Sequence, residues 1–157
     1  MVSQYDTSVK AAWRDSACGP TATHIVLSHY GLTYSINELY RTLGTTRLGL
    51  FTPCLIRNAK RLLGDDFVVA RASVKTVMQL LDCQLPVLAK FDCFTSCTPW
   101  RKAYYRYHWV VLTSYYLQHD QLHFIGNSNG NIFTFDYATS AHALTFVQLT
   151  KRDSPLR

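Results

Sequence analysis

The chain has 157 residues, of which 48% are apolar and 17% charged, and its formal net charge is +6. This composition excludes a disordered chain, and the length suits a single domain with its own hydrophobic core, which we assign to residues 1–157. The positive charge favours anionic partners, but the basic residues form no long run and match no nucleic-acid-binding motif, so we expect no nucleic-acid partner.

The first predicted helix begins next to a cysteine. Cys18 and Gly19 precede Pro20, a residue that suits the first turn of a helix, and an apolar run follows. Gly31 ends that run. The pattern predicts a helix over residues 19–30 with Cys18 at its N-terminus.

Three further helices are predicted before the middle of the chain. The segment 35–38 reads Ser-Ile-Asn-Glu and matches a capping box. Thr52-Pro53 has the pattern of an N-cap followed by a first-turn proline, and an amphipathic stretch continues from there to Gly64. Ser73 opens a fourth, shorter helix whose apolar residues recur at helical spacing.

The second half of the chain changes to strand patterns. Short apolar or alternating runs are separated by turn signals such as His119-Asp120 and the Asn-Ser-Asn-Gly sequence of 127–130. Helices followed by strands predict an α+β fold, with an N-terminal helical lobe and a C-terminal antiparallel β-sheet lobe. A cleft between two such lobes is a natural place for a functional site. The predicted strands cover residues 86–91, 109–116, 121–126, 132–135 and 146–149.

Several classes of protein and site are not indicated. No segment has the ~20 apolar residues that a membrane-spanning helix needs. The first ten residues lack the apolar core of a signal peptide, so we expect a cytoplasmic protein, or a secreted one whose signal has been removed. The five unevenly spaced cysteines do not suggest a disulfide framework, although a Cys93–Cys97 pair is open. We expect neither a metal nor a cofactor, and the sequence leaves the oligomeric state open.

Cys18 is the candidate nucleophile. A thiol attacks as the thiolate, and the N-terminus of a helix favours that anion. The same helix end offers backbone N–H groups that can hold an oxyanion. A buried structural cysteine at a tight turn is the alternative, and spacing alone does not decide between the two.

A cysteine nucleophile needs a base and a residue that orients the base. His108 stands immediately before the apolar run Trp109–Leu112, where a strand can anchor it while its ring faces a cleft. Asn127 follows the next predicted strand, and its amide oxygen could accept the imidazole N–H. A turn residue without a catalytic role is the alternative for Asn127, since turns favour Asn.

The residues around these positions resemble those of the C39-like peptidases, the bacteriocin-processing type of papain-like cysteine peptidase. Residues 13–22, with their Cys-Gly-Pro, resemble the catalytic helix of that family, and residues 108–112 resemble its histidine strand. The similarity runs over nearly the whole chain, with Leu43-Gly44-Thr45 and Leu85-Pro86-Val87 as weaker matches. It implies a papain-like fold and a stand-alone family member that hydrolyses peptide bonds through a thioester, with a peptide or protein as its substrate.

The resemblance also implies roles for single residues. Cys18 becomes the nucleophile and His108 the base. The orienting residue of the family is usually Asp, and Asn127 stands in its place here. The family places a Gln upstream of the cysteine as an oxyanion donor, usually about six residues away, where this chain has Ala12. We therefore predict Gln4 in that role, with a longer connection to Cys18.

Two expectations complete the interpretation. The segment 92–107, basic and rich in Tyr, should border the substrate cleft because it leads directly into His108. Cys18 and His108 should form a thiolate–imidazolium pair at neutral pH. The alternatives to a thiol peptidase are an amidase or transpeptidase on the same fold, and a catalytically decayed peptide-binding module.

Overall fold

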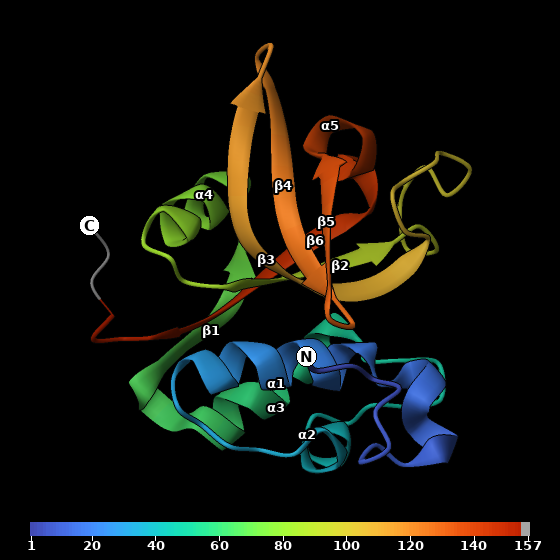
Figure 1. Cartoon of the computed structure of the whole chain (residues 1–157), viewed down its shortest axis with the longest axis vertical. Coiled ribbons are helices and arrows are strands. Elements are labelled where there is room, and N and C mark those ends of the chain that lie inside the picture. The colour runs from blue at the N-terminus through green and yellow to red at the C-terminus, as the bar shows by residue number, and fades with distance from the viewer. Residues whose placement is uncertain (155–157) are drawn as a thin grey trace.

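The computed structural model describes residues 1–154 and contains helices on both faces of one sheet (Figure 1). The α1, α2 and α3 helices lie together on one side, where α1 packs against the central strands. The α4 and α5 helices contribute to the core on the opposite face. The helices are α1 (Cys18–His29), α2 (Ile36–Thr42), α3 (Thr52–Leu63), α4 (Val74–Asp82) and α5 (Tyr137–Ser140), with short 3-10 turns at Ala11–Ser16, Gly64–Asp66 and Ala141–Ala143.

Six strands form the sheet, in the order β1-β6-β2-β3-β4-β5, and every neighbouring pair is antiparallel. The predicted α+β class and the antiparallel sheet are therefore confirmed. The β1 strand was not predicted, and it lies between α3 and α4, so helices and strands are not strictly separated along the chain. The strands are β1 (Phe67–Ala72), β2 (Val87–Asp92), β3 (Tyr107–Gln118), β4 (Gln121–Ser128), β5 (Asn131–Asp136) and β6 (Leu144–Lys151).

The helix starts follow local capping chemistry. The capping box at Ser35 is formed in both directions with Glu38, as predicted. The Ser73 hydroxyl caps α4 by accepting the N–H of Thr76. The prediction for α3 was wrong by one residue, because Thr52 already lies in the helix and Phe51 is its N-cap, without a side-chain hydrogen bond.

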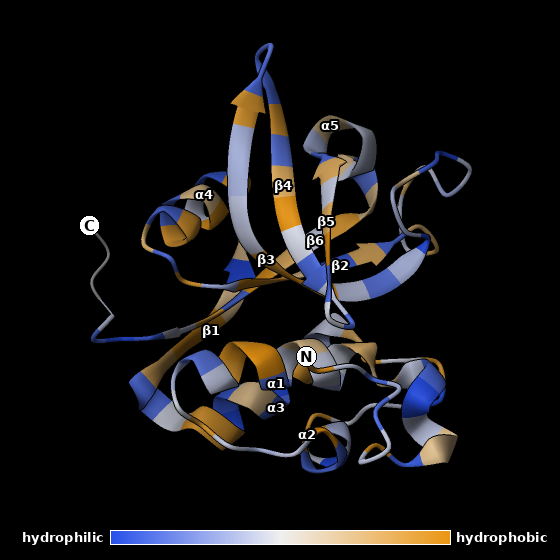
Figure 2. Cartoon of the chain, in the orientation of Figure 1, coloured by the Kyte–Doolittle hydropathy of each residue, from blue (hydrophilic) through white to orange (hydrophobic). Residues whose placement is uncertain are grey.

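Two apolar cores lie on the two faces of the sheet, and successive side chains of β3 point alternately into one core and the other. Trp109 and Val111 point into the core built with α1 and α3, whereas Val110 and Leu112 point into the core built with α4. Figure 2 shows hydrophobic residues where helices meet strands and a hydrophilic turn at the tip of the β3–β4 hairpin. This arrangement fixes the N-terminus of α1 beside the first residues of β3.

The β3–β4 hairpin contains an irregularity that matters for the site. Its two turn residues, His119 and Asp120, both have positive φ, as a type I′ turn requires. From the turn the strands pair regularly until a β-bulge between Leu112 and Ser114 shifts the register by one residue. Beyond the bulge, Asn127 pairs with Val111.

Candidate active site

Cys18 is the first residue of α1, and only 6% of its surface is exposed. The N-cap Ala17 offers no side-chain cap, so the helix end keeps backbone N–H groups for other acceptors. Burial raises the pKa of the Cys18 thiol, while backbone hydrogen bonds from Trp109, Gly19 and Cys18 itself pull that pKa down. The helix end thus holds the sulfur in a dry environment that is rich in N–H donors.

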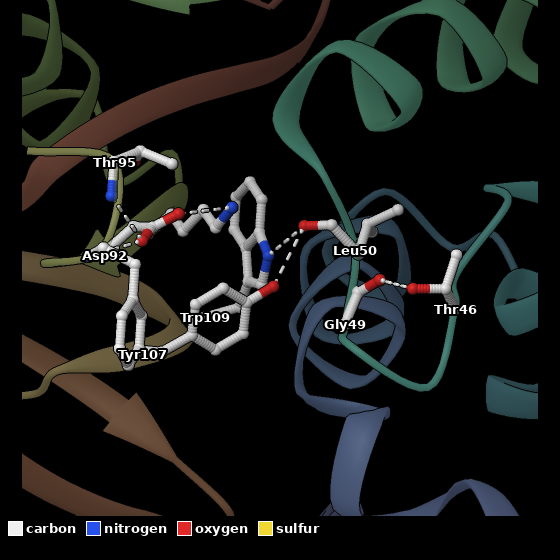
Figure 3. Close-up of polar contacts among 9 residues, drawn as sticks. Thr46, Gly49, Leu50, Asp92, Thr95, Tyr107 and Trp109 are labelled. Atoms are coloured by element: carbon white, nitrogen blue, oxygen red, sulfur yellow. Dashed lines mark hydrogen bonds and ion pairs between the residues drawn. The ribbon is translucent and has the colours of Figure 1, made fainter.

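The loop before α3 locks this helix end against β3. The backbone carbonyl of Leu50 accepts hydrogen bonds from the indole of Trp109 at 2.9 Å and from the phenol of Tyr107 at 3.4 Å (Figure 3). Gly19 lies so close that a Cβ there would meet Leu50 side-chain atoms at 2.8 Å. Glycine after the cysteine is therefore required by packing, in addition to any role near a substrate.

His108 is the second residue of β3 and is partly buried. Burial lowers the pKa of its imidazole to about 4. Its Nε2 atom lies 2.6 Å from the hydroxyl oxygen of Ser128, and its ring packs at 4.8 Å from the ring of Tyr105. The ring is thus held on two sides before any substrate arrives.

Gln4 lies in the same site although 13 residues separate it from Cys18. It is 3% exposed, and its Nε2 donates to the carbonyl of Arg14 at 2.7 Å. Asn129 holds it from the other side, because the Gln4 backbone N–H donates to the Asn129 Oδ1 atom at 3.0 Å. Its role as an oxyanion donor stays a prediction.

Asn127 lines the same cavity as Cys18 and His108. Within the described part of the chain, however, it makes no hydrogen bond to His108, contrary to the prediction. The Asn127 Oδ1 atom accepts the backbone N–H of Gly130 at 3.2 Å and so closes the turn before β5. The ring of His108 bonds to Ser128 instead. This geometry corrects the predicted contact, while a catalytic effect of Asn127 remains a prediction.

The predicted residues converge on one small cavity of about 10 Å³, roughly the room of one water molecule. Gln4, Cys18, His108 and Asn127 all line it, together with Ser128 and Asn129. A larger cavity of about 360 Å³ adjoins it and shares His108, Ser128 and Asn129. Tyr105 and Tyr107, at the end of the segment 92–107, line this larger cavity. That the segment borders a substrate cleft stays a prediction.

Sequence reasoning missed three residues of the site, namely Ser128, Asn129 and the buried Lys90. Ser128 and Asn129 belong to the turn sequence after β4, where polar residues have an ordinary explanation. Lys90 lies inside the apolar run that forms β2, and its charge lowers the pKa of Cys18. A lysine within an apolar strand was the one available signal, since such a charge needs a partner when buried.

The electrostatics disagree with the predicted thiolate–imidazolium pair. Burial favours the neutral thiol at Cys18 and the neutral imidazole at His108. No hydrogen bond joins the Cys18 sulfur to the His108 ring within the described part of the chain. Both pKa directions therefore favour a neutral thiol beside a neutral imidazole in the free protein.

Alkylation should reveal this neutral pair. We expect iodoacetamide to modify Cys18 at pH 6 no faster than the exposed Cys97, and the Cys18 rate to rise only in alkaline solution, because burial raises the pKa of the thiol and keeps the thiolate scarce at lower pH. His108→Ala should leave the rate at pH 6 unchanged. Site-resolved mass spectrometry measures both rates. Rapid labelling of Cys18 at pH 6 that disappears in His108→Ala would restore the ion pair.

Comparisons with known proteins decide the family. The chain matches the family described as "Peptidase_C39 like family" over residues 1–141. It belongs to that family. The resemblance seen in the sequence is therefore confirmed, and the family is one of cysteine peptidases. A comparison with the curated proteins finds no match.

A solved structure shows the same fold. The chain is similar to the peptidase domain of Streptococcus ComA, a bifunctional ABC transporter involved in a quorum-sensing pathway. The identity is 21%, the TM-score is 0.62, and the match covers 96% of this chain and 97% of the ComA domain. This likeness supports a papain-like C39 fold for the chain.

Three structural findings bear on other kinds of site. Within residues 1–154, no helix is long and apolar enough to cross a membrane. The same residues contain no cluster of three or more His, Cys, Asp or Glu side chains arranged to hold a metal ion. Cys93 and Cys97 carry free thiols, so the pair that was left open is not formed.

Proposed function

We propose that the protein is a thiol peptidase in which Cys18 is the nucleophile and His108 the general base. The observation that carries this proposal is the convergence of the α1 N-terminus and the first residues of β3 on one cavity, with Cys18 and His108 both in its wall. Membership of a cysteine peptidase family supports the same chemistry. Peptides or proteins are the proposed substrates, and the 360 Å³ cavity beside His108 offers room for a side chain next to the scissile bond.

The neutral resting pair sets the order of proton transfers. His108 takes the thiol proton as the Cys18 sulfur bonds to the substrate carbonyl carbon, and the carbonyl oxygen becomes an oxyanion. The backbone N–H groups at the start of α1 and the side chain of Gln4 are the proposed donors to that oxyanion. His108 then gives its proton to the leaving amine as the C–N bond breaks. Water hydrolyses the thioester and restores the thiol.

A catalytically decayed peptide-binding module is the second candidate. The pKa directions at Cys18 and His108 favour it, because both disfavour the charged forms that many thiol enzymes hold at rest. The hydrogen-bond partner of His108 is also a neutral hydroxyl, which stabilises an imidazolium less than a carboxylate does. An amidase or transpeptidase would use the same residues and differs only in its products.

The test is a search for the acyl-enzyme. The protein is incubated with a pool of peptides of known sequence, and the reaction is quenched in acid, which preserves thioesters. We expect shortened peptides, and an adduct on Cys18 whose mass equals the acyl part of an N-terminal product. An adduct on the exposed Cys97 serves as the control for non-specific acylation.

Each product pattern assigns one function. New peptide termini with a Cys18 adduct support the peptidase. Ammonia from amidated peptides identifies an amidase, and joined peptides identify a transpeptidase. Neither product nor adduct, while peptides still bind, identifies the decayed module.

A further inference from the structure

We propose that Ser128 is the positioning residue of His108 and that Tyr105 supports it from behind. The inference rests on the thiol-peptidase function proposed above and concerns the residue that holds the base in its working orientation. It replaces the contact expected from Asn127.

His108 and Ser128 are in direct contact. The Nε2 atom of His108 and the hydroxyl oxygen of Ser128 are 2.6 Å apart, at the short end of hydrogen-bond distances. The side-chain oxygen of Asn127, the residue expected to make this contact, instead accepts the backbone N–H of Gly130. Both Ser128 and Asn127 line the cavity that contains Cys18, so proximity alone does not distinguish them, but hydrogen bonding does.

The register of the hairpin explains why Ser128 has the contact. Paired residues of neighbouring strands point to the same face, and successive residues alternate between faces. Because Asn127 pairs with Val111, it lies on the opposite face from His108, whereas Ser128 shares the face of His108. Without the bulge, the register set by the turn would pair Asn127 with Leu112 and place it on the His108 face. The bulge thus places Ser128, in place of Asn127, on the same face of the sheet as His108.

Tyr105 completes the arrangement. Tyr105 and Ser128 line the same cavity, and the Tyr105 ring lies 4.8 Å from the ring of His108. Burial raises the pKa of the Tyr105 phenol, and the neighbouring Ser128 hydroxyl lowers it. Phe91 and Phe133 pack edge-on against Tyr105, with ring centroids 5.3 Å and 5.5 Å away, and fix it in turn. In the proposed arrangement the Ser128 hydroxyl accepts the His108 N–H and turns its own proton toward the Tyr105 oxygen.

This chain of hydrogen bonds selects a tautomer. If Nε2 carries the proton and donates it to Ser128, the lone pair on Nδ1 is free to take the proton of Cys18. A hydroxyl performs this selection without adding negative charge, which agrees with an imidazole that stays neutral in its buried position. Ser128 therefore orients the neutral imidazole of His108, but it supplies no negative charge to stabilise the imidazolium that forms when His108 takes a proton.

Ring-nitrogen NMR of ¹⁵N-histidine-labelled protein tests the proposal without requiring cleavage. The His108 signals are assigned by their loss in His108→Gln. At pH 7 we expect the wild type to show the tautomer protonated at Nε2, Ser128→Ala to show a mixture of tautomers, and Asn127→Ala to keep the wild-type pattern. Ser128→Asp should move the His108 titration from about 4 upward toward its ordinary 6.5, because a carboxylate favours the imidazolium. A mixture in Asn127→Ala, with Ser128→Ala unchanged, would overturn the proposal.

Turnover provides the second measurement. Ser128→Ala should lower kcat about tenfold and leave KM unchanged, the loss expected when one orienting hydrogen bond is removed. Ser128→Thr keeps the hydroxyl and should restore most of kcat. A protein that cleaves no peptide refutes the proposed function but leaves the NMR result intact. If Ser128→Ala and Ser128→Thr lower kcat equally, the hydroxyl has no positioning role.

Discussion

Replacing Cys18 with Ala should lower the rate of peptide cleavage by at least about 10⁴-fold, because removal of the nucleophile abolishes the covalent route and leaves only binding and oxyanion stabilisation. The fold should survive, since alanine suits a helix start as well as cysteine and only one sulfur atom leaves the core. Cleavage of a fluorogenic peptide, measured alongside a thermal melt, separates the loss of chemistry from the loss of structure.

Cys54 offers the matched control. It lies in the first turn of α3, half-buried against the same core as Cys18, but it does not line the cavity of the site. Cys54→Ala should keep the wild-type rate and cost about 1 kcal/mol of stability. If Cys18→Ala cleaves as fast as Cys54→Ala, Cys18 is a structural cysteine, which is the alternative that its position at a tight turn left open.

Local signals were enough to predict the helical half of the site. The proline and glycines around Cys18 fix where α1 begins and ends, and the capping residues at Ser35 and Ser73 do the same for α2 and α4. These signals act over three or four residues, so one sequence contains them completely. The short β1 strand was missed because its apolar run is brief, continues as Ala-Arg-Ala, and lies between two strong helices.

The partner of His108 could not be predicted because it depends on a bulge. The turn at His119-Asp120 and the alternation along the strands predict a regular hairpin, which would bring Asn127 to the His108 face. The bulge near Leu112 moves every later residue of β4 to the other face relative to β3. No residue between Leu112 and Ser114 has a sequence pattern that predicts a bulge. The contact between His108 and Ser128 could therefore be found only in the three-dimensional structure.

The protonation states were unpredictable for a related reason. A helix N-terminus and a nearby histidine both suggest an acidic thiol, and the sequence contains both. Burial acts in the opposite direction at Cys18 and at His108, and burial is a property of the packed molecule. The loop at Leu50, which covers the start of α1, lies 32 residues after Cys18 in the sequence. Its contribution to the burial of Cys18 could therefore not be predicted from a local sequence pattern.

Lys90 and Asp92 form a buried ion pair beside the site. They are 4% and 7% exposed, and the Lys90 Nζ atom lies 3.1 Å from the carboxylate of Asp92. The ammonium also faces the rings of Tyr107 at 4.9 Å and Trp109 at 5.6 Å, both of which bond to the Leu50 carbonyl. The second carboxylate oxygen of Asp92 accepts two backbone N–H groups of the loop after β2.

Lys90→Met should lower the free energy of unfolding by about 3–5 kcal/mol, because it leaves the Asp92 carboxylate buried without its cation. It should also raise the pKa of Cys18 further, since the positive charge of Lys90 lowers that pKa in the wild type. Urea unfolding measures the first effect. The pH dependence of Cys18 alkylation in the folded variant measures the second.

The double variant Lys90→Met/Asp92→Asn separates the cost of an unpaired charge from the value of the pair. Asn keeps an oxygen for the two backbone N–H groups after β2 and removes the buried charge, so most of the lost stability should return. The alkylation pKa of Cys18 should remain raised, because the cation is still missing. A double variant as unstable as Lys90→Met would show that Lys90 stabilises the fold through the rings of Tyr107 and Trp109 and not through Asp92. A Cys18 pKa that returns to the wild-type value would show that Lys90 does not act on the nucleophile through its charge.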